Sequence, residues 1–375
     1  MFPFQRSYYH LNRIEVSKDA LVHNYRELQR INTKCGVIPV LKSNAYGHGL
    51  AQLAQVVDTF KAPLVAVDSL YEAYELQKFH VKTPILILGY TQPDNFKVKR
   101  LPFQYAVYDA RLLKTLDRYQ PGVKIHLFVD TGMSREGIPL SQLRAFITEA
   151  KKCQHISIVG LCSHFADADT HESEMTQKQL HAFEDARKIV KDEGITISYT
   201  HISASGGALH VDNSPFSHIR VGLVLYGFSP LSSSDPDNAK VDVHPALSLH
   251  STLVQVKTIA KGSSIGYGCT FTAKKEMTIG ILPLGYYEGV DRRLSNVGCV
   301  TIRGTMCPIV GRVSMNMTTI DVSNATTAAV GDDVVVYSDN PSDPNSIQTL
   351  AGHIGSIPYE LLAAGLSESV YRKLV

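Results

Sequence analysis

Short apolar runs alternate with helical patterns from Val37 to Tyr226, and this alternation restricts the fold more than any other feature of the sequence. Runs of about four to eight apolar residues between turn formers are typical of buried strands. The segments between them, such as Ala110–Tyr119, Leu140–Lys152 and Met175–Lys191, have the spacing of amphipathic helices. Eight such units, with no GxGxxG motif at the first helix, predict a (β/α)8 TIM-type barrel rather than an open doubly wound sheet. The predicted strands are Val37–Leu41, Leu64–Val67, Ile85–Leu88, Tyr105–Tyr108, Ile125–Val129, Ile156–Leu161, Tyr199–Ser203 and Ile219–Tyr226.

A polar, turn-rich stretch from Ser232 to Asp237 marks a domain boundary. We therefore predict that residues 1–236 form the barrel and that residues 237–375 form a mainly β second domain. Beyond the boundary, short apolar strands are separated by glycine-containing turns, and helical spacing returns only near the end. The predicted strands are Leu249–Ile259, Met277–Pro283, Cys299–Ile302, Pro308–Val313, Met317–Val322 and Asp333–Tyr337, and the predicted helices are Ile347–Ile354 and Tyr359–Leu366.

The composition limits the class of protein. A chain of 375 residues is long enough for two domains with their own cores. Its net charge of +2, without a basic block, argues against nucleic acid and favours small-molecule partners. No apolar run approaches the roughly 20 residues that span a bilayer, and Met1–Arg6 lacks the basic start of a signal peptide. Six cysteines without CxxC spacing indicate neither zinc nor a disulfide framework. These features predict a soluble, cytoplasmic protein with no metal site.

The segment Val40–Gly49, with the sequence VLKSNAYGHG, is the first candidate for chemistry. Lys42 follows a predicted strand, and the carboxyl ends of barrel strands form the rim where such enzymes act. A lysine in an enclosed site can lose its proton and form a Schiff base with an aldehyde. The segment resembles the cofactor-lysine segment of the alanine racemases. The resemblance implies that Lys42 binds pyridoxal 5'-phosphate as an aldimine and that Tyr46 reaches the phosphate.

A second rim segment, Asp130–Arg135, has the sequence DTGMSR. A guanidinium binds a carboxylate or a phenolate oxygen at two points, which a lysine cannot do. The segment matches the DTGMxR motif of the same family, which implies that Arg135 binds the substrate carboxylate near the cofactor's phenolate. Many relatives have a carbamate-forming lysine seven residues earlier, whose negative charge braces this arginine. This chain has Phe128 there, so we expect either a bound anion such as chloride or another carboxylate to hold Arg135.

Later strands supply further candidates for the cofactor site. His164 ends the sixth strand, and the resemblance places it against the cofactor ring. Ser205 precedes two glycines, whose N–H groups suit a phosphate. Arg220 lies in the apolar eighth strand, where burial without a partner would be costly. The resemblance places Arg220 at the pyridine nitrogen and the N–H groups of Gly222 and Leu223 at the phosphate. Because arginine stays protonated, it would keep that nitrogen unprotonated and weaken the electron sink.

The second domain supplies the other predicted base. Tyr267, between Gly266 and Gly268, resembles the family's glycine-flanked tyrosine, which enters the active site of the partner subunit in a dimer. Tyrosine is a weak base at its usual pKa near 10, so it needs positive charge nearby, which a relay from His164 to Arg220 would supply. By resemblance, Tyr286 and Met315 fall at substrate-binding positions, and three residues line the entrance: Asp169, Arg292 and Arg312.

Some positions depart from the family pattern. Ala204 replaces a frequent asparagine, Ser314 replaces a cysteine of some members, and Asn316 replaces the usual aspartate. The C-terminal signature expected after Tyr359 is replaced by Leu366–Val370, so no C-terminal tyrosine is assigned to the phosphate.

The residues and the resemblance together predict a homodimeric, pyridoxal-phosphate-dependent alanine racemase that supplies D-alanine for peptidoglycan. In this two-base prediction, Lys42 serves the D-enantiomer, and Tyr267 of the partner subunit serves the L-enantiomer. The first alternative is a racemase for serine, lysine or a broad set of amino acids. The second is a non-catalytic cofactor-binding barrel, although such proteins lack the second domain and its base.

Overall fold

The computed structural model describes residues 9–232 and 234–375, so the prediction on Met1–Arg6 and part of the predicted boundary, Ser233, lie outside the described residues. These residues form two compact units. The first unit comprises Asp19–Ala45 and Leu53–Val243. The second comprises the described residues up to Lys18, Tyr46–Gln52 and His244–Val375. The N-terminal strand thus belongs to the second unit and not to the barrel.

The first unit is a ring of eight parallel strands. Six of them follow the order β3-β4-β5-β6-β8-β9, and β10 pairs with β2. The ring closes on one side through Arg220, whose N–H donates to the Ser203 carbonyl over 3.0 Å, and on the other through a bridge between Val40 and Ala66. The predicted (β/α)8 barrel is therefore confirmed. The strands are β2 (Gly36–Pro39), β3 (Val65–Val67), β4 (Ile85–Ile87), β5 (Gln104–Val107), β6 (Val123–Asp130), β8 (Ile156–Cys162), β9 (Tyr199–His201) and β10 (His218–Val221).

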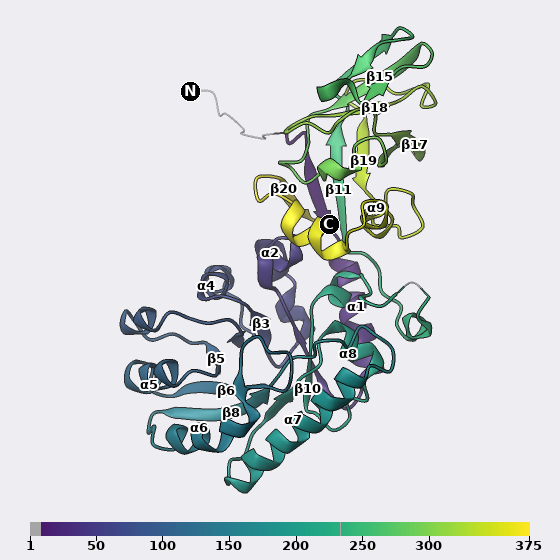
Figure 1. The fold of residues 1–375 in the computed structure, drawn as a ribbon. Coiled ribbons are helices and arrows are strands. Elements are labelled where there is room, and N and C mark those ends of the chain that lie inside the picture. The colour runs from purple at the N-terminus through teal and green to yellow at the C-terminus, as the bar shows by residue number, and fades with distance from the viewer. Residues whose placement is uncertain (1–8, 233) are drawn as a thin grey trace, which may run out of the picture. The chain divides into compact units, whose positions relative to one another are not determined.

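Helices pack outside this ring, as α4 to α7 show in Figure 1. Side-chain caps fix their starts: Asp109 accepts a hydrogen bond from the N–H of Leu112 at α5, and Ser69 and Glu72 form a capping box at α4. The elements are α1 (Lys18–Ile31), α3 (Leu50–Ala54), η1 (Val57–Phe60), α4 (Leu70–Lys78), η2 (Pro93–Lys97), α5 (Ala110–Tyr119), η3 (Leu140–Gln142), α6 (Leu143–Ala150), α7 (Glu174–Asp192), α8 (Ser205–His210), η4 (Leu223–Tyr226) and η5 (Pro236–Lys240), with a short strand β7 (Ile138–Pro139) beside β6.

One predicted barrel strand was too long. The run Ile219–Tyr226 leaves the strand at Val221, and η4 follows as a turn of 3-10 helix. Its apolar residues are still buried, and the Tyr226 hydroxyl donates to the Val40 carbonyl over 3.0 Å. An apolar run of this length is compatible with a buried strand or a buried helical turn, so periodicity could not separate the two.

The second unit is mainly antiparallel sheet. The N-terminal strand β1 lies inside a six-stranded sheet of order β17-β16-β19-β11-β1-β20, pairing antiparallel with β11 and parallel with β20. A three-stranded sheet and a hairpin complete the unit. Its elements are β1 (Arg13–Val16), β11 (Leu247–Thr252), β12 (Gln255–Ile259), β13 (Ser264–Ile265), η6 (Tyr267–Cys269), β14 (Phe271–Thr272), β15 (Met277–Leu282), η7 (Arg292–Leu294), β16 (Cys299–Ile302), β17 (Thr305–Pro308), β18 (Thr318–Asp321), β19 (Asp333–Tyr337), α9 (Ile347–His353), the π-helical turn η8 (Glu360–Gly365) and β20 (Tyr371–Leu374).

Two strand predictions in this unit were wrong in detail. The run Leu249–Ile259 is divided between β11 and β12. The run Pro308–Val313 is not a strand, because β17 ends at Pro308 and Gly311 takes a φ of 78°. Among the described residues, every helix is too short or too polar to cross a bilayer.

Candidate active site

Lys42 begins a left-handed turn just after β2. In this turn, α2 (Lys42–Tyr46), the residues Ser43, Asn44 and Ala45 have φ angles of 55°, 52° and 54°. L-residues avoid this conformation by roughly 1–2 kcal/mol each, so the surrounding structure must hold it. A buried carboxylate does so: Glu72 accepts a hydrogen bond from the N–H of Ser43 over 2.6 Å.

Glu72 also fixes the start of the neighbouring helix. Its second oxygen accepts hydrogen bonds from the N–H groups of Asp68, over 2.8 Å, and Ser69, over 3.1 Å. One carboxylate therefore joins the turn that carries Lys42 to the rim after β3. Sequence reasoning missed this residue, because its only local signal is the Ser-x-x-Glu pattern of a capping box.

Arg220 is buried in β10, and its guanidinium is largely committed to the protein. One terminal nitrogen donates to the ring and the carbonyl of His201, and the other donates to His164 Nδ1 over 3.0 Å. The second nitrogen also donates to the carbonyls of Ser163 and Ile202. No described residue accepts a hydrogen bond from the Nε–H. That N–H is therefore the donor left for a ligand.

The arginine sets the direction of a buried hydrogen-bond chain. Because Arg220 can only donate, His201 Nδ1 must accept, and its proton must lie on Nε2. That N–H donates to His126 Nδ1 over 2.9 Å, so His126 carries its proton on Nε2 and donates to Gln104 Oε1 over 2.9 Å. Both histidines are neutral in this chain. Burial lowers the pKa of His126 to about 3 and that of His201 well below the usual value.

His164 lies at the same rim, after β8. Since its Nδ1 accepts from Arg220, its Nε2 carries the proton and remains a donor. Burial, followed by the charges of Arg220, Arg135 and Lys42, lowers the pKa of His164 to about 3. Gln179, buried on α7, donates to the His164 carbonyl over 2.8 Å and fixes the loop. The barrel thus gathers three cations around one neutral histidine, which suits an anionic ligand.

Acid should destabilise the protein through these three histidines. Their folded pKa values lie below the unfolded value near 6.5, so the unfolded chain binds more protons as the pH falls from 6.5 toward 3. Stability is then lost at up to about 1.4 kcal/mol per pH unit for each histidine. Urea unfolding at a series of pH values should show a smaller slope for His126→Gln, and the exposed control His353→Gln should keep the wild-type slope. An unchanged slope in His126→Gln would show that His126 is not held neutral.

Arg135 lies in a tightly held loop after β6. Asp130 Oδ1 accepts hydrogen bonds from the N–H groups of Gly132, over 2.9 Å, and Ser134, over 3.1 Å. The Arg135 guanidinium contacts the Glu136 carboxylate at two points, from Nε over 2.5 Å and from a terminal nitrogen over 2.9 Å. A neighbouring carboxylate, one of the two alternatives left open by Phe128, is thus present and is supplied by the next residue. The sequence signal was Glu136 itself, directly after the motif.

Ser205 joins the starts of α8 and η4. Its buried Oγ accepts hydrogen bonds from the N–H groups of Gly222, over 3.2 Å, and Val224, over 3.4 Å. The predicted phosphate residues Ser205 and Gly222 are therefore in contact, and Leu223 follows Gly222 in η4.

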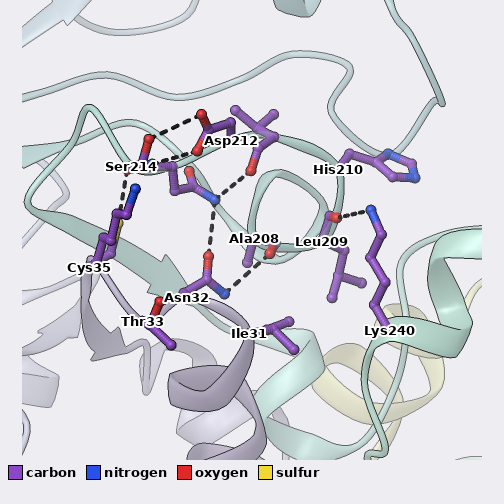
Figure 2. Close-up of a pocket in the computed structure, with 13 residues that line it drawn as sticks. Ile31, Asn32, Thr33, Cys35, Ala208, Leu209, His210, Asp212, Ser214 and Lys240 are labelled. Atoms are coloured by element: carbon purple, nitrogen blue, oxygen red, sulfur yellow. Dashed lines mark hydrogen bonds between the residues drawn. The ribbon is translucent and has the colours of Figure 1, made fainter.

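The far end of α8 borders a hollow of about 410 Å³, which is lined by the ends of α1 and α8, by the residues that follow them and by Lys240 (Figure 2). The Asn213 amide donates to the Asn32 side chain over 3.2 Å and to the Gly207 carbonyl over 2.9 Å. Asn32 in turn donates to the Ala208 carbonyl over 3.3 Å. These buried amides are paired with each other and with the backbone of α8, so they position the helix that carries Ser205.

The candidate residues of the second unit lie on connected loops. Tyr267 is 72% exposed between Gly266 and Gly268, whose φ angles of 72° and 70° are accessible to glycine. A side chain at Gly268 would meet the Arg312 guanidinium at 2.9 Å, so the two loops pack together. A second pair of loops is joined by the N–H of Tyr286, which donates to the Ser314 carbonyl over 3.0 Å. Tyr286 and Met315 are exposed on these loops. Arg292 begins η7, and the Asn316 amide donates to the Glu288 carboxylate over 2.6 Å.

Tyr46 also belongs to the second unit. Its ring lies against the ring of Tyr359, with 5.9 Å between centroids. Sequence reasoning assigned no role to Tyr359, because the residues that follow it depart from the family pattern.

The fold and the cationic rim define an enzyme built on a (β/α)8 barrel with an appended β unit. Residues 16–230 match the family model described as alanine racemase, N-terminal domain, and residues 246–374 match the model described as alanine racemase, C-terminal domain. The chain belongs to the alanine racemase family.

Individual relatives agree along nearly the whole chain. "Alanine racemase 2" of Caldanaerobacter subterraneus subsp. tengcongensis is 34% identical over 369 residues, covering 96% of this chain and 94% of that protein. "Alanine racemase" of Methanococcus maripaludis is 33% identical over 355 residues, covering 93% and 94%. The solved alanine racemase of Clostridium difficile 630 has a TM-score of 0.91 at 26% identity, covering 97% of this chain and 95% of that one.

Proposed function

We propose that this chain is an alanine racemase that interconverts L- and D-alanine with pyridoxal 5'-phosphate as cofactor. The observation that carries the proposal is the barrel rim, where a lysine, two arginines and a neutral histidine gather and one buried N–H of Arg220 has no partner among the described residues. The relatives named alanine racemase support the substrate.

The residues of the barrel fit the proposed cofactor. Lys42 is the amine for a Schiff base with its aldehyde, and the free Nε–H of Arg220 suits its ring nitrogen as an acceptor. The proposed phosphate ligands are the Ser205 hydroxyl, the Leu223 N–H and the Gly222 N–H, which donates to Ser205 Oγ in this structure, together with Tyr46 of the second unit. When bound, the cofactor supplies an electron sink for the carbanion formed at the substrate Cα.

Arg220 determines how strong that sink is. A guanidinium cannot accept a proton from the ring nitrogen, and its other N–H groups are occupied by His201, His164 and backbone carbonyls. Arg220 would therefore hold the ring nitrogen of the cofactor unprotonated, and the cofactor would supply a weaker electron sink than one paired with a carboxylate. A weaker sink would favour return of the proton to the substrate Cα over transfer of the amino group.

Two bases on opposite faces of the substrate would then move the proton. We assign the D-enantiomer to Lys42 and the L-enantiomer to Tyr267 of the partner subunit, in a homodimer with shared sites. The exposure of Tyr267 on its glycine-flanked loop supports a role in another subunit's site. His164 would donate its Nε2–H to the hydroxyl oxygen of this tyrosine and so orient it toward the substrate.

Substrate binding would rest on Arg135, which has N–H groups left for a carboxylate after its contact with Glu136. Tyr286 and Met315, adjacent on the second unit, would line the space for the substrate side chain.

We place the protein in the cytoplasm as a source of D-alanine for peptidoglycan. Its cysteines are all unpaired among the described residues.

The substrate assignment is tested by incubating the purified, cofactor-loaded protein with single L-amino acids and separating the products by chiral chromatography. We expect D-alanine to form fastest, and L- and D-alanine to reach equal amounts from either side. Faster conversion of serine or lysine would show that this amino acid, and not alanine, is the substrate. Absence of every D-product would favour a non-catalytic cofactor-binding protein.

A further inference from the structure

We propose that Glu136 is a positioning residue that holds Arg135 for a substrate carboxylate and makes the site independent of any dissolved anion. The inference rests on the proposed function of the same site. Its basis is the two-point contact between the Glu136 carboxylate and the Arg135 guanidinium.

The backbone fixes where this pair lies. Asp130 Oδ1 holds the first part of the loop by accepting hydrogen bonds from the N–H groups of Gly132 and Ser134. After the pair, Gly137 has a φ of 129°, and the chain returns to pair with β6 through β7. The loop is therefore tied at both ends, and only the direction of the Arg135 side chain remains to be set. A two-point contact fixes the plane of a guanidinium, which a single hydrogen bond does not.

The contact with Glu136 uses two of the five N–H donors of the Arg135 guanidinium. Its Nε–H and one N–H of a terminal nitrogen face Glu136. Three N–H groups remain, and no described residue accepts from them. A planar guanidinium held along one edge presents its other edge in a fixed direction, so the remaining donors are oriented before a ligand arrives.

The side chains packed around position 128 are uncharged, and the carboxylate that contacts the Arg135 guanidinium is that of Glu136. The position that carries a carbamate in many relatives is Phe128, which is buried in an apolar cluster with Ala106 and Cys162, against Leu88 and Tyr108. Burial raises the pKa of Cys162 to about 12 and also raises that of Tyr108, so both stay neutral.

The charge of Glu136 acts on this same region. After burial, it is the next cause that raises the pKa of Tyr108, and it contributes to the raised pKa of Cys162. It also opposes the repulsion between Arg135 and Arg220. The carboxylate thus offsets one of the three cations of the rim. Because the Arg135 and Glu136 side chains are 54% and 27% exposed, their contact contributes little to folding stability, and its effect should appear in ligand binding.

The test compares Glu136→Gln with the wild type in chloride-free buffer containing a bulky anion. The variant keeps the shape of the side chain but loses its charge. We expect KM for alanine to rise about tenfold or more, with kcat changed less, because a mobile guanidinium loses its preorientation. Chloride should lower this KM toward the wild-type value in a saturable manner, and the wild type should show no chloride response. Removal of dissolved carbon dioxide should leave the wild type unchanged.

A second readout does not need turnover. Propionate, a carboxylate without the reacting amine, should bind about tenfold more weakly to Glu136→Gln than to wild type in calorimetry. Glu184→Gln is the matched control, since Glu184 also pairs with an arginine, Arg187, but on the outer helix α7. If Glu136→Gln does not fold, Glu136→Ala replaces it, with the same expected rise in KM and the same saturable recovery by chloride.

Several results would overturn the proposal. Glu136→Gln behaving like Glu184→Gln in both readouts would show that the contact positions nothing. Saturable activation of the wild type by chloride would assign the role to a bound ion, and activation by bicarbonate would assign it to a carbamate on another lysine. A wild type that binds propionate but racemises no amino acid would refute the proposed function alone, since the propionate series still tests Glu136.

Discussion

Lys42→Ala should lower the rate of alanine racemisation by about 10⁴-fold or more, because the substitution removes both the amine that holds the cofactor and one of the two proposed bases. Lys42→Arg should be about as inactive, since it keeps the positive charge but cannot form the Schiff base. Both variants should fold, because the turn is held by the hydrogen bond from the backbone N–H of Ser43 to the Glu72 carboxylate rather than by the lysine side chain. Initial rates from L-alanine, with circular dichroism as a check on folding, measure the effect.

The matched control for this experiment is Lys151→Ala. Lys151 lies on the outside of the barrel, where it pairs with Glu193, and its loss should leave the rate unchanged. If Lys42→Ala kept activity within tenfold of the wild type, the chemistry would have to use another amine.

Tyr267→Phe should have the second largest effect, and it should be rescued in trans. The variant keeps the ring but loses the hydroxyl, so we expect a loss of about 10²- to 10⁴-fold. Mixing it with Lys42→Ala and allowing the subunits to exchange should restore about a quarter of the wild-type activity. Half of the dimers are then mixed, and each mixed dimer has one site with both native bases.

The control for this mixing experiment is Tyr287→Phe, which also changes an exposed tyrosine of the second unit. It should stay active without a partner variant. Mass spectrometry of the intact dimers verifies that subunits have exchanged. Full exchange without recovery of activity would contradict a site shared between subunits.

The sequence predicted the elements of the fold better than their ends. All eight barrel strands lie where short apolar runs suggested, because strands buried on both faces read as continuous apolar runs between turn formers. The last strand was too long, since an apolar run does not reveal that η4 replaces the strand after Val221. The sequence also did not predict that the N-terminal strand belongs to the second unit, because β1 pairs with β11 and β20, which lie far away in the chain.

The candidate site was predictable where one residue implies its own environment. An arginine in an apolar strand implied a buried partner, and Arg220 has His201, His164 and three backbone carbonyls as acceptors. The supporting residues were not predictable, because they depend on contacts between distant segments. Gln104, His126 and His201 come from three strands, and only the closed barrel places them in one chain of hydrogen bonds.

The left-handed turn after Lys42 was also not predictable from the sequence. Neither Ser43 nor Ala45 favours a positive φ, and no local pattern leads one to expect four such residues in succession, from Ser43 to Tyr46. The conformation depends on Glu72, which lies on another βα unit of the barrel. Strain of this kind is found where surrounding structure overrides local preference.

Reduction of the cofactor-loaded protein with borohydride tests the central claim most directly. The reagent fixes a Schiff base as a stable amine, so digestion and mass spectrometry should place the added mass of the reduced cofactor on the peptide that contains Lys42, with a matching change in absorbance. Lys42→Ala should bind cofactor without any reducible bond. A modified lysine elsewhere in the chain, or a reducible bond that survives in Lys42→Ala, would contradict the account.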